Sequence, residues 1–205
     1  MMEKTTLKGM DSPIILSPII TFVIAIAVFF NNITNSTPLI TLDGLSDLIR
    51  ANVPTYTLIY DDIATGNIDW WSWKMGIGTT LFSHADVLFD PFTYITMLFG
   101  RDNIAYMLVW SLIIKIMAES VAISLYLRHF KMNTGAIVVC AVMYAFCGWS
   151  LIMGSNLALG TILVYFPILL LSIEKYLETG KTKLLFLIIF LIAVYNYYFL
   201  FSSGL

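Results

Sequence analysis

The stretch at residues 103–127, NIAYMLVWSLIIKIMAESVAISLYL, decides the class of fold. It is apolar over more than the roughly 20 helical residues that a bilayer core requires. Its charged side chains are confined to Lys115 and Glu119, one helical turn apart. We therefore predict a membrane-spanning helix over this stretch.

The composition extends this prediction to the whole chain. Of the 205 residues, 59% are hydrophobic and 12% are charged, and the mean hydropathy is +0.86. Soluble domains carry about 25% charged residues, so a soluble monomer is excluded and an integral membrane protein is indicated. The net charge of −2 gives no basic surface for nucleic acid, so we expect no nucleic-acid partner. Cys140 and Cys147 lack the spacing of metal ligands.

Four further stretches are apolar enough to be interpreted as spans. The last of the five runs to the end of the sequence, which we interpret as a truncated helix. We predict an all-α polytopic membrane protein with about five transmembrane helices in one membrane domain, plus interfacial helices in a long first outer loop. The predicted spans are residues 13–30, 103–127, 134–153, 157–177 and 184–205.

The lysine and arginine residues indicate the orientation, because cytoplasmic segments carry an excess of them. With residues 1–12 in the cytoplasm, seven basic residues face inward, three face outward, and Lys115 lies in the membrane. We therefore expect a multi-pass protein of the cell membrane with its first long loop outside. The inward set is Lys4, Lys8, Arg128, Lys131, Lys175, Lys181 and Lys183, and the outward set is Arg50, Lys74 and Arg101.

The predicted outer loop, residues 31–102, is too rich in apolar residues to be a plain linker. From Leu45 to Ile63 the apolar residues recur at helical spacing, which predicts interfacial helices. Pro54 predicts a break near Val53, and Gly66 predicts the end of the second helix.

The second half of the loop contains three tryptophans and two turn signals. Trp70, Trp71 and Trp73 either anchor the loop at the headgroup level or form a stacking platform for a sugar or lipid headgroup. The sequence 76–78, Gly-Ile-Gly, predicts a tight turn, and the Asp-Pro pair at 90–91 predicts the start of a short interfacial or re-entrant helix.

Four outer carboxylates are candidates for chemistry. Asp43 and Asp47 share one face if their segment is helical. Each could act as a general base, ligate a divalent cation such as Mg²⁺ or Mn²⁺ through oxygen, or cap a helix. The adjacent Asp61 and Asp62 suit either a metal or acceptor site or a solvated surface.

The charges inside the second span need partners, because a charge at bilayer depth is costly. The spacing of Lys115 and Glu119 suits an intramembrane pair, and a role in binding phosphate is the alternative. His129 lies in a basic run that indicates topology, and His84 is interpreted as solitary.

The order of these motifs resembles the YfhO-type bacterial membrane proteins over nearly the whole chain. The outer loop supplies the first part of the match, and the later spans supply the rest. The matching residues are Asp47, Pro54, Gly66, the Trp-rich stretch, 76–78, 90–92, Lys115, 165–167, 173–175 and 196–199.

The resemblance implies a multi-spanning glycosyltransferase of the GT-C architecture that uses a polyprenyl-phosphate sugar as donor. The implied acceptor is a cell-envelope polymer such as lipoteichoic acid. Family members are much longer, so the resemblance implies an N-terminal part that is not active alone. The catalytic base of the first outer loop falls on Asp47, and Arg50, Lys74 and Lys115 are the candidates for binding the donor phosphate.

Two other functions remain open from the sequence. One is a translocator of lipid-linked sugars or another transporter, and the other is a non-catalytic membrane component. Transporters tend to contain broken helices and internal repeats near the midplane. No convincing repeat is present, although Gly160 and Pro167 interrupt the fourth predicted span.

Overall fold

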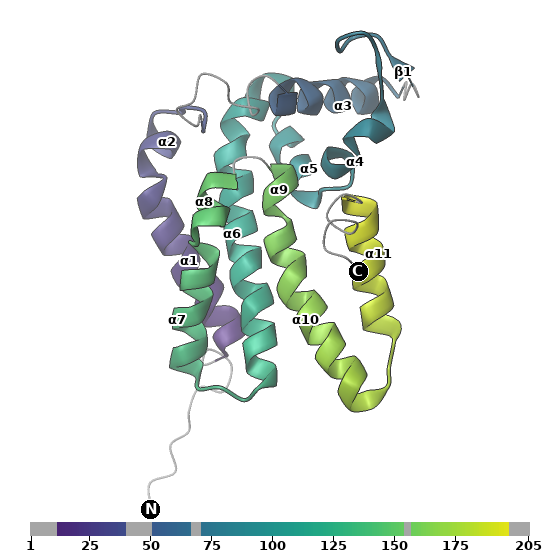
Figure 1. Cartoon of the computed structure of the whole chain (residues 1–205). Coiled ribbons are helices and arrows are strands. Elements are labelled where there is room, and N and C mark those ends of the chain that lie inside the picture. Colours follow the sequence, from purple (N-terminus) through teal and green to yellow (C-terminus); the bar gives the residue numbers. More distant parts are fainter. Residues whose placement is uncertain (1–11, 40–50, 67–70, 154–156, 197–205) are drawn as a thin grey trace, which may run out of the picture.

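The computed structural model describes residues 12–39, 51–66, 71–153 and 157–196, and these residues form a helical bundle with a shelf across one end (Figure 1). Five helices run along the bundle, and α3 crosses its upper end. The helices of the bundle are α1 (Pro13–Val28), α6 (Ile104–His129), α7 (Thr134–Ala145), α10 (Ile162–Thr179) and α11 (Lys183–Tyr195).

Shorter elements complete the two ends and the breaks of the bundle. They are α2 (Phe30–Thr34), α3 (Val53–Thr65), β1 (Trp71–Ser72), β2 (Thr79–Thr80), η2 (Leu81–His84), α4 (Ala85–Leu88), α5 (Pro91–Met97), η3 (Arg101–Asn103), α8 (Gly148–Met153) and α9 (Leu157–Gly160).

Helix α6 is the centre of the bundle and packs against α1, α7, α10 and α5. Small polar residues line its contact with α1, where Ser17 and Ser124 are hydrogen-bonded at 2.7 Å and Thr21 donates to Ser120 at 3.1 Å. Small side chains of this kind let two helices approach closely in a membrane, where water provides no hydrophobic drive. The prediction of a long helix over residues 103–127 is confirmed.

Within the described residues, one helical segment, Arg101–His129, is long and apolar enough to cross a membrane. Three shorter apolar helices accompany it: Pro13–Val28, Thr134–Ala145 and Lys183–Tyr195. The third and fourth predicted spans are each two helices, with breaks between α7 and α8 and between α9 and α10. Pro167 lies inside α10, so the break in the fourth span falls at Thr161 and not at this proline. The count of five spans therefore stays a prediction.

The shelf, which we define as residues 51–66 and 71–97, rests on the bundle through an apolar cluster. Tyr56 and Ile59 of α3 are buried against Val87, Met97 and Ile104. The helix begins at Val53 with Pro54 in its first turn, and it ends at Gly66 with φ of +66°. The predicted stop at Gly66 is confirmed, whereas residues 51–52 already form a π-helical turn that continues into α3, so the chain does not break at Val53. Part of the first predicted interfacial helix falls on residues 40–50, outside the described ranges.

The shelf also contains a hairpin that the all-α prediction did not include. Strands β1 and β2 pair antiparallel, with Trp71 opposite Thr80. The turn between them uses Gly76 at φ +56° and Gly78 at φ +101°, which confirms the predicted tight turn. Trp71 and Trp73 lie edge to face with centroids 5.6 Å apart, and both are exposed. This arrangement suits both of the predicted roles, anchoring of the loop at the headgroup level and stacking against a sugar or lipid headgroup.

Replacing Gly78 with Ala is expected to open the hairpin. A Cβ at this position would lie 2.5 Å from the Trp71 ring, whereas Gly76 has no neighbour within 4 Å. Both substitutions carry the cost of a positive φ, at least about 1 kcal/mol, but only the first adds a clash. Hydrogen exchange at the hairpin amides should therefore be faster in Gly78→Ala than in Gly76→Ala. Equal protection in the two variants would contradict the close contact.

Candidate functional site

The shelf holds two of the predicted carboxylates next to each other on α3, with Asp61 partly exposed and Asp62 buried, and each has its own cation. The Nε of Arg101 donates to both Asp61 oxygens, at 2.9 and 3.2 Å. The Nζ of Lys74 lies 3.5 Å from Asp62 Oδ1. The two neighbouring acids thus lie at one place on α3, yet their charges are compensated separately.

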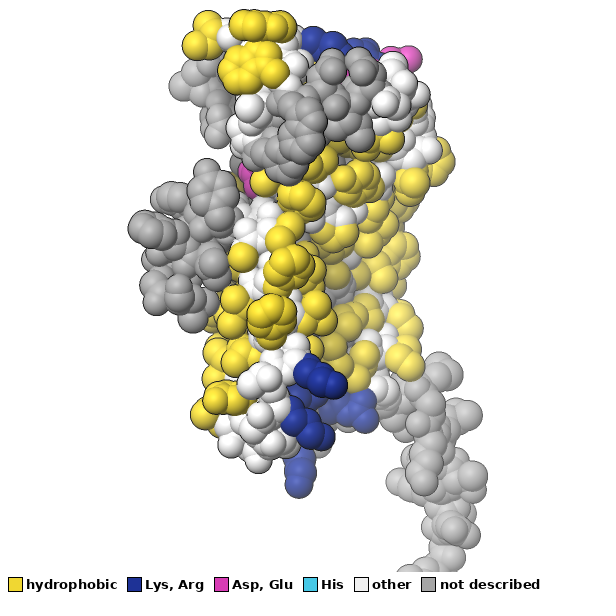
Figure 2. Space-filling model, turned by 90° about the vertical axis from the view of Figure 1, so that its right-hand side faces the viewer, with side chains coloured by type: hydrophobic (Ala, Val, Ile, Leu, Met, Phe, Trp, Pro, Cys, Tyr) yellow, Lys and Arg dark blue, Asp and Glu magenta, His cyan; other side chains and the backbone are white. Residues whose placement is uncertain are grey.

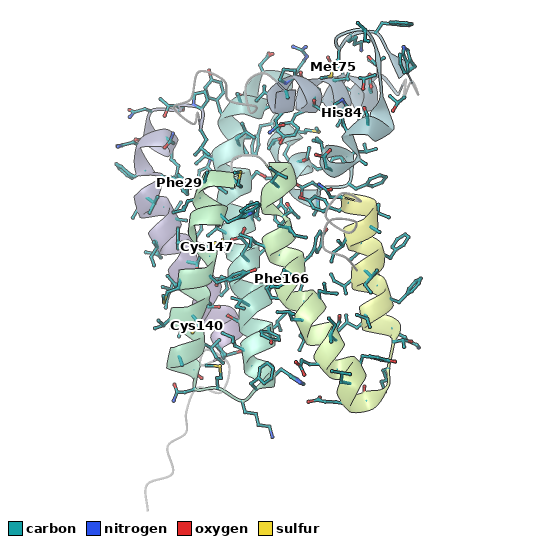
Figure 3. The ribbon with its side chains drawn as sticks, viewed as in Figure 1. Phe29, Met75, His84, Cys140, Cys147 and Phe166 are labelled. Atoms are coloured by element: carbon teal, nitrogen blue, oxygen red, sulfur yellow. The ribbon has the colours of Figure 1, made fainter. Side chains whose placement is uncertain are left out.

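Neither acid belongs to a metal site formed by the described residues. These contain no group of three or more histidine, cysteine, aspartate or glutamate side chains that could hold a metal ion. His84 ends η2 just before α4 and lies below Met75 of the hairpin (Figure 3), and its Nε2 has no hydrogen-bond partner within the described ranges. Cys140 on α7 and Cys147 just after it are free thiols set apart along the bundle.

Three of the predicted site residues lie outside the ranges that the structure describes. Asp43, Asp47 and Arg50 all fall within residues 40–50. The helices that flank this segment in the sequence, α2 and α3, both lie at the upper end of Figure 1. The role of Asp47 therefore stays a prediction.

A fully buried charge cluster lies where the shelf meets the bundle, around Asp90 of the shelf. This residue caps α5, where its Oδ1 accepts from the Phe92 N–H at 3.0 Å. The hydroxyl of Thr161, at the break between α9 and α10, donates to both Asp90 oxygens at 3.1 Å. The Nζ of Lys115 lies 4.0 Å from Asp90 Oδ2, and both side chains are completely buried. One carboxylate thus joins the shelf, α6 and α10.

Aromatic and backbone contacts complete the surroundings of Lys115. Its Nζ lies 5.5 Å from the centre of the Phe92 ring, within the range of a cation–π contact. The hydroxyl of Ser111 donates to the Phe92 carbonyl at 2.6 Å, which fastens α5 to α6. A charge at this depth is tolerated when it is paired in this way.

Burial raises the pKa of Asp90 to about 6, and the Lys115 ammonium, the Phe92 N–H and the Thr161 hydroxyl limit this rise. The carboxylate is therefore mostly ionised at neutral pH, and its attraction to Lys115 is retained there. Mild acid would protonate it and remove its attraction to Lys115, but because this pKa is higher than in the unfolded chain, protonation would not by itself lower the free energy of unfolding.

Glu119 lies one turn along α6 from Lys115 and has its own partner. Its Oε2 accepts from the Ser150 hydroxyl of α8 at 2.8 Å, whereas its Oε1 has no hydrogen-bond partner in the described part of the chain. The predicted pairing of Lys115 with Glu119 stays a prediction, and the structure adds a second carboxylate, Asp90, whose Oδ2 lies 4.0 Å from the Lys115 ammonium. Local spacing suggested Glu119, and a partner distant in sequence could not be seen.

Asp90 and Thr161 are the members of this cluster that sequence reasoning missed. The Asp-Pro pair signalled the start of a helix, which α5 confirms, but assigned no charge partner to the aspartate. A usable signal was Lys115 itself, since a buried lysine requires a carboxylate. The helix break at Thr161 offered no signal, because a single threonine in an apolar run is ordinary.

An apolar groove of about 380 Å³ lies beside the shelf between α3 and α5. Tyr60, Ile63, Tyr94 and Leu98 contribute to its walls. Tyr60 of its wall and Asp61 of the Asp61–Arg101 pair belong to the same helix, α3. Charged groups and an apolar surface therefore meet at this end of the molecule.

The opposite end of the bundle is basic. Figure 2 shows lysine and arginine side chains gathered at the lower tip below a column of hydrophobic side chains. We call this the basic end and define it by Arg128, Lys131, Lys175, Lys181 and Lys183. The chain thus has one end for the shelf, a long apolar middle and a basic end.

These features define the class of the molecule as a helical bundle with an apolar middle, a folded shelf at one end and a basic end opposite. A family model described as bacterial membrane protein YfhO matches residues 16–205. The chain therefore belongs to the YfhO family, as the sequence motifs had suggested. Comparison with curated proteins and with solved structures gave no match.

Proposed function

We propose that this chain forms part of a membrane glycosyltransferase of GT-C type. Its donor is a polyprenyl-phosphate sugar, and its acceptor is a hydroxyl of a cell-envelope polymer such as lipoteichoic acid. The observation that supports this proposal best is the shelf itself. It places carboxylates, cations and an apolar groove together at the end opposite the basic end.

The reaction requires one base and one cation at the membrane surface. The acceptor oxygen attacks the anomeric carbon and forms the new glycosidic bond, while the bond from that carbon to the phosphate oxygen breaks. The hydroxyl proton passes to the base, for which we propose Asp47. The leaving polyprenyl phosphate keeps the bonding electron pair, and a nearby cation stabilises its charge.

The described residues favour one candidate cation over another. Lys74 has an exposed side chain on the shelf, and its contact with Asp62 is long, at 3.5 Å. Lys115 is completely buried against Asp90. We therefore assign donor-phosphate binding to Lys74 together with Arg50, and a supporting role to Lys115. Asp43, Asp61 and Asp62 remain candidates for holding the acceptor or a divalent cation.

The positive-inside rule supports the orientation that this chemistry needs. The described lysine and arginine residues outside the bundle core gather at the basic end, whereas Lys74 and Arg101 lie at the shelf. We propose that the basic end faces the cytoplasm and the shelf faces outward.

The test is a transfer assay on the full-length protein in proteoliposomes. The probes are a radiolabelled polyprenyl-phosphate hexose and purified lipoteichoic acid. We expect label to appear in the polymer only when donor and protein are both present. Label that never leaves the lipid would contradict the proposal.

A translocator of lipid-linked sugars is the second candidate, and the breaks between α7 and α8 and between α9 and α10 favour it. The same proteoliposomes separate the two functions. Movement of the labelled donor between leaflets without transfer to polymer would indicate translocation.

A further inference from the structure

A pocket of about 810 Å³ opens at the basic end, where the end of α6 meets the turn between α10 and α11. Its walls include His129, Lys175, Glu178, Lys181 and Lys183. It lies at the end opposite the shelf, so none of the residues proposed for sugar transfer contributes to it.

The charges around this pocket are unbalanced. The carboxylate of Glu178 is engaged by His129, whose Nε2 lies 3.1 Å from Glu178 Oε1. Within the described ranges, none of the three lysines has a carboxylate within 4.0 Å of its ammonium group. Helix α11 begins at the pocket and has no acidic residue in its first turn. An anion would therefore find three lysine cations and one acid, Glu178, whose Oε1 lies against His129.

The surface beside the pocket is apolar and open. Leu177 of α10 is 72% exposed, and Phe186 and Phe190 of α11 are 73% and 54% exposed. Figure 2 shows hydrophobic side chains rising directly from the basic tip along this face. A free phosphate ion would use only the cations, whereas a phospholipid would use both surfaces.

We propose that this pocket binds the phosphate headgroup of an anionic phospholipid, with the acyl chains along the exposed apolar sides of α10 and α11. Basic pockets between helices at the cytoplasmic surface suit such headgroups. Lys175 of α10, Lys181 of the turn between the helices and Lys183 at the start of α11 bind the phosphate together. The inference is independent of sugar transfer.

The experiment measures lipid retained by the full-length protein in native mass spectrometry. Protein is released from nanodiscs of phosphatidylcholine alone or mixed with phosphatidylglycerol. Lys181→Gln with Lys183→Gln removes two charges from the pocket. Arg128→Gln with Lys131→Gln removes two charges from the same end but outside the pocket walls. Lys175→Gln tests the contribution of α10 to the pocket separately.

We expect the pocket pair to lower phosphatidylglycerol retention about tenfold or more, and the matched pair to leave most of it. Lys175→Gln should also reduce retention, and inorganic phosphate should not displace the lipid. Equal losses in the two double variants would overturn the site, since they would show attraction by net charge alone. Binding of inorganic phosphate with no preference for phosphatidylglycerol would overturn the assignment to a lipid.

Discussion

Replacing Lys115 with Met is expected to destabilise the protein by about 3–5 kcal/mol, because it leaves the buried Asp90 carboxylate without its cation. Asp90→Asn should also destabilise the protein, because the buried Lys115 ammonium loses the carboxylate that lies 4.0 Å away. The measurement is the midpoint of denaturation of the purified full-length protein in detergent.

The double variant Asp90→Asn with Lys115→Met provides the decisive comparison. Removing both charges should restore part of the stability lost in either single variant, because the Asp90 carboxylate and the Lys115 ammonium are then both absent, while Glu119 stays buried one turn along α6 in all variants that lack Lys115. Arg101→Gln is the matched control, since it breaks a pair with Asp61 that is partly exposed, and it should lie close to the wild type. Additive losses in the double variant would contradict a direct Asp90–Lys115 interaction.

The effect of Lys115→Met should also depend on pH. Burial already holds the pKa of Asp90 at about 6, and losing the attraction of Lys115 can only raise it further. A carboxyl whose pKa is higher in the folded state than in the unfolded state loses stability as the pH rises through that interval. The variant should therefore be less destabilised at pH 5 than at pH 8, and the opposite trend would contradict burial of the carboxylate.

Asp47→Asn is expected to lower sugar transfer by about 10²–10⁴-fold, the range for loss of a general base. Donor binding should be retained, because the amide has the shape of the carboxylate and only the proton acceptor is lost. The assay is the transfer of labelled hexose from polyprenyl phosphate to lipoteichoic acid by the full-length protein.

Asp102→Asn is the control for Asp47→Asn. Asp102 is an exposed acid of the short helix Arg101–Asn103 near the shelf, to which no catalytic role is assigned. It should leave transfer within a few-fold of the wild type. Undiminished transfer by the Asp47→Asn variant would show that Asp47 is not the base, although the protein would still be a sugar transferase.

The parts of the fold that sequence could predict are those with a local cause. The apolar run at 103–127 is sufficient for α6, and Pro54 and Gly66 delimit α3 through their own backbone preferences. The Asp-Pro pair begins α5 for the same reason, because the aspartate caps and the proline suits the first turn.

The parts that sequence could not predict depend on contacts between distant segments. Asp90, Lys115 and Thr161 meet only because α5 folds back onto α6 beside the α9–α10 break. The spacing of Lys115 and Glu119 offered a nearer partner, and although a buried lysine requires a carboxylate, nothing in the sequence identified Asp90 as that carboxylate. The hairpin was missed because its two strands are two residues each, too short to show an alternating pattern.

Substituted-cysteine labelling in intact bacteria tests the proposed orientation, on which sugar transfer at the shelf depends. With Cys140 and Cys147 replaced by Ala, single cysteines are introduced at Thr65 on the shelf and at Met132 beside the basic end, both exposed positions. We predict that a membrane-impermeant maleimide labels Thr65→Cys in intact cells, and labels Met132→Cys only after permeabilisation. Labelling of Met132→Cys but not Thr65→Cys in intact cells would place the shelf in the cytoplasm and contradict sugar transfer at the outer face.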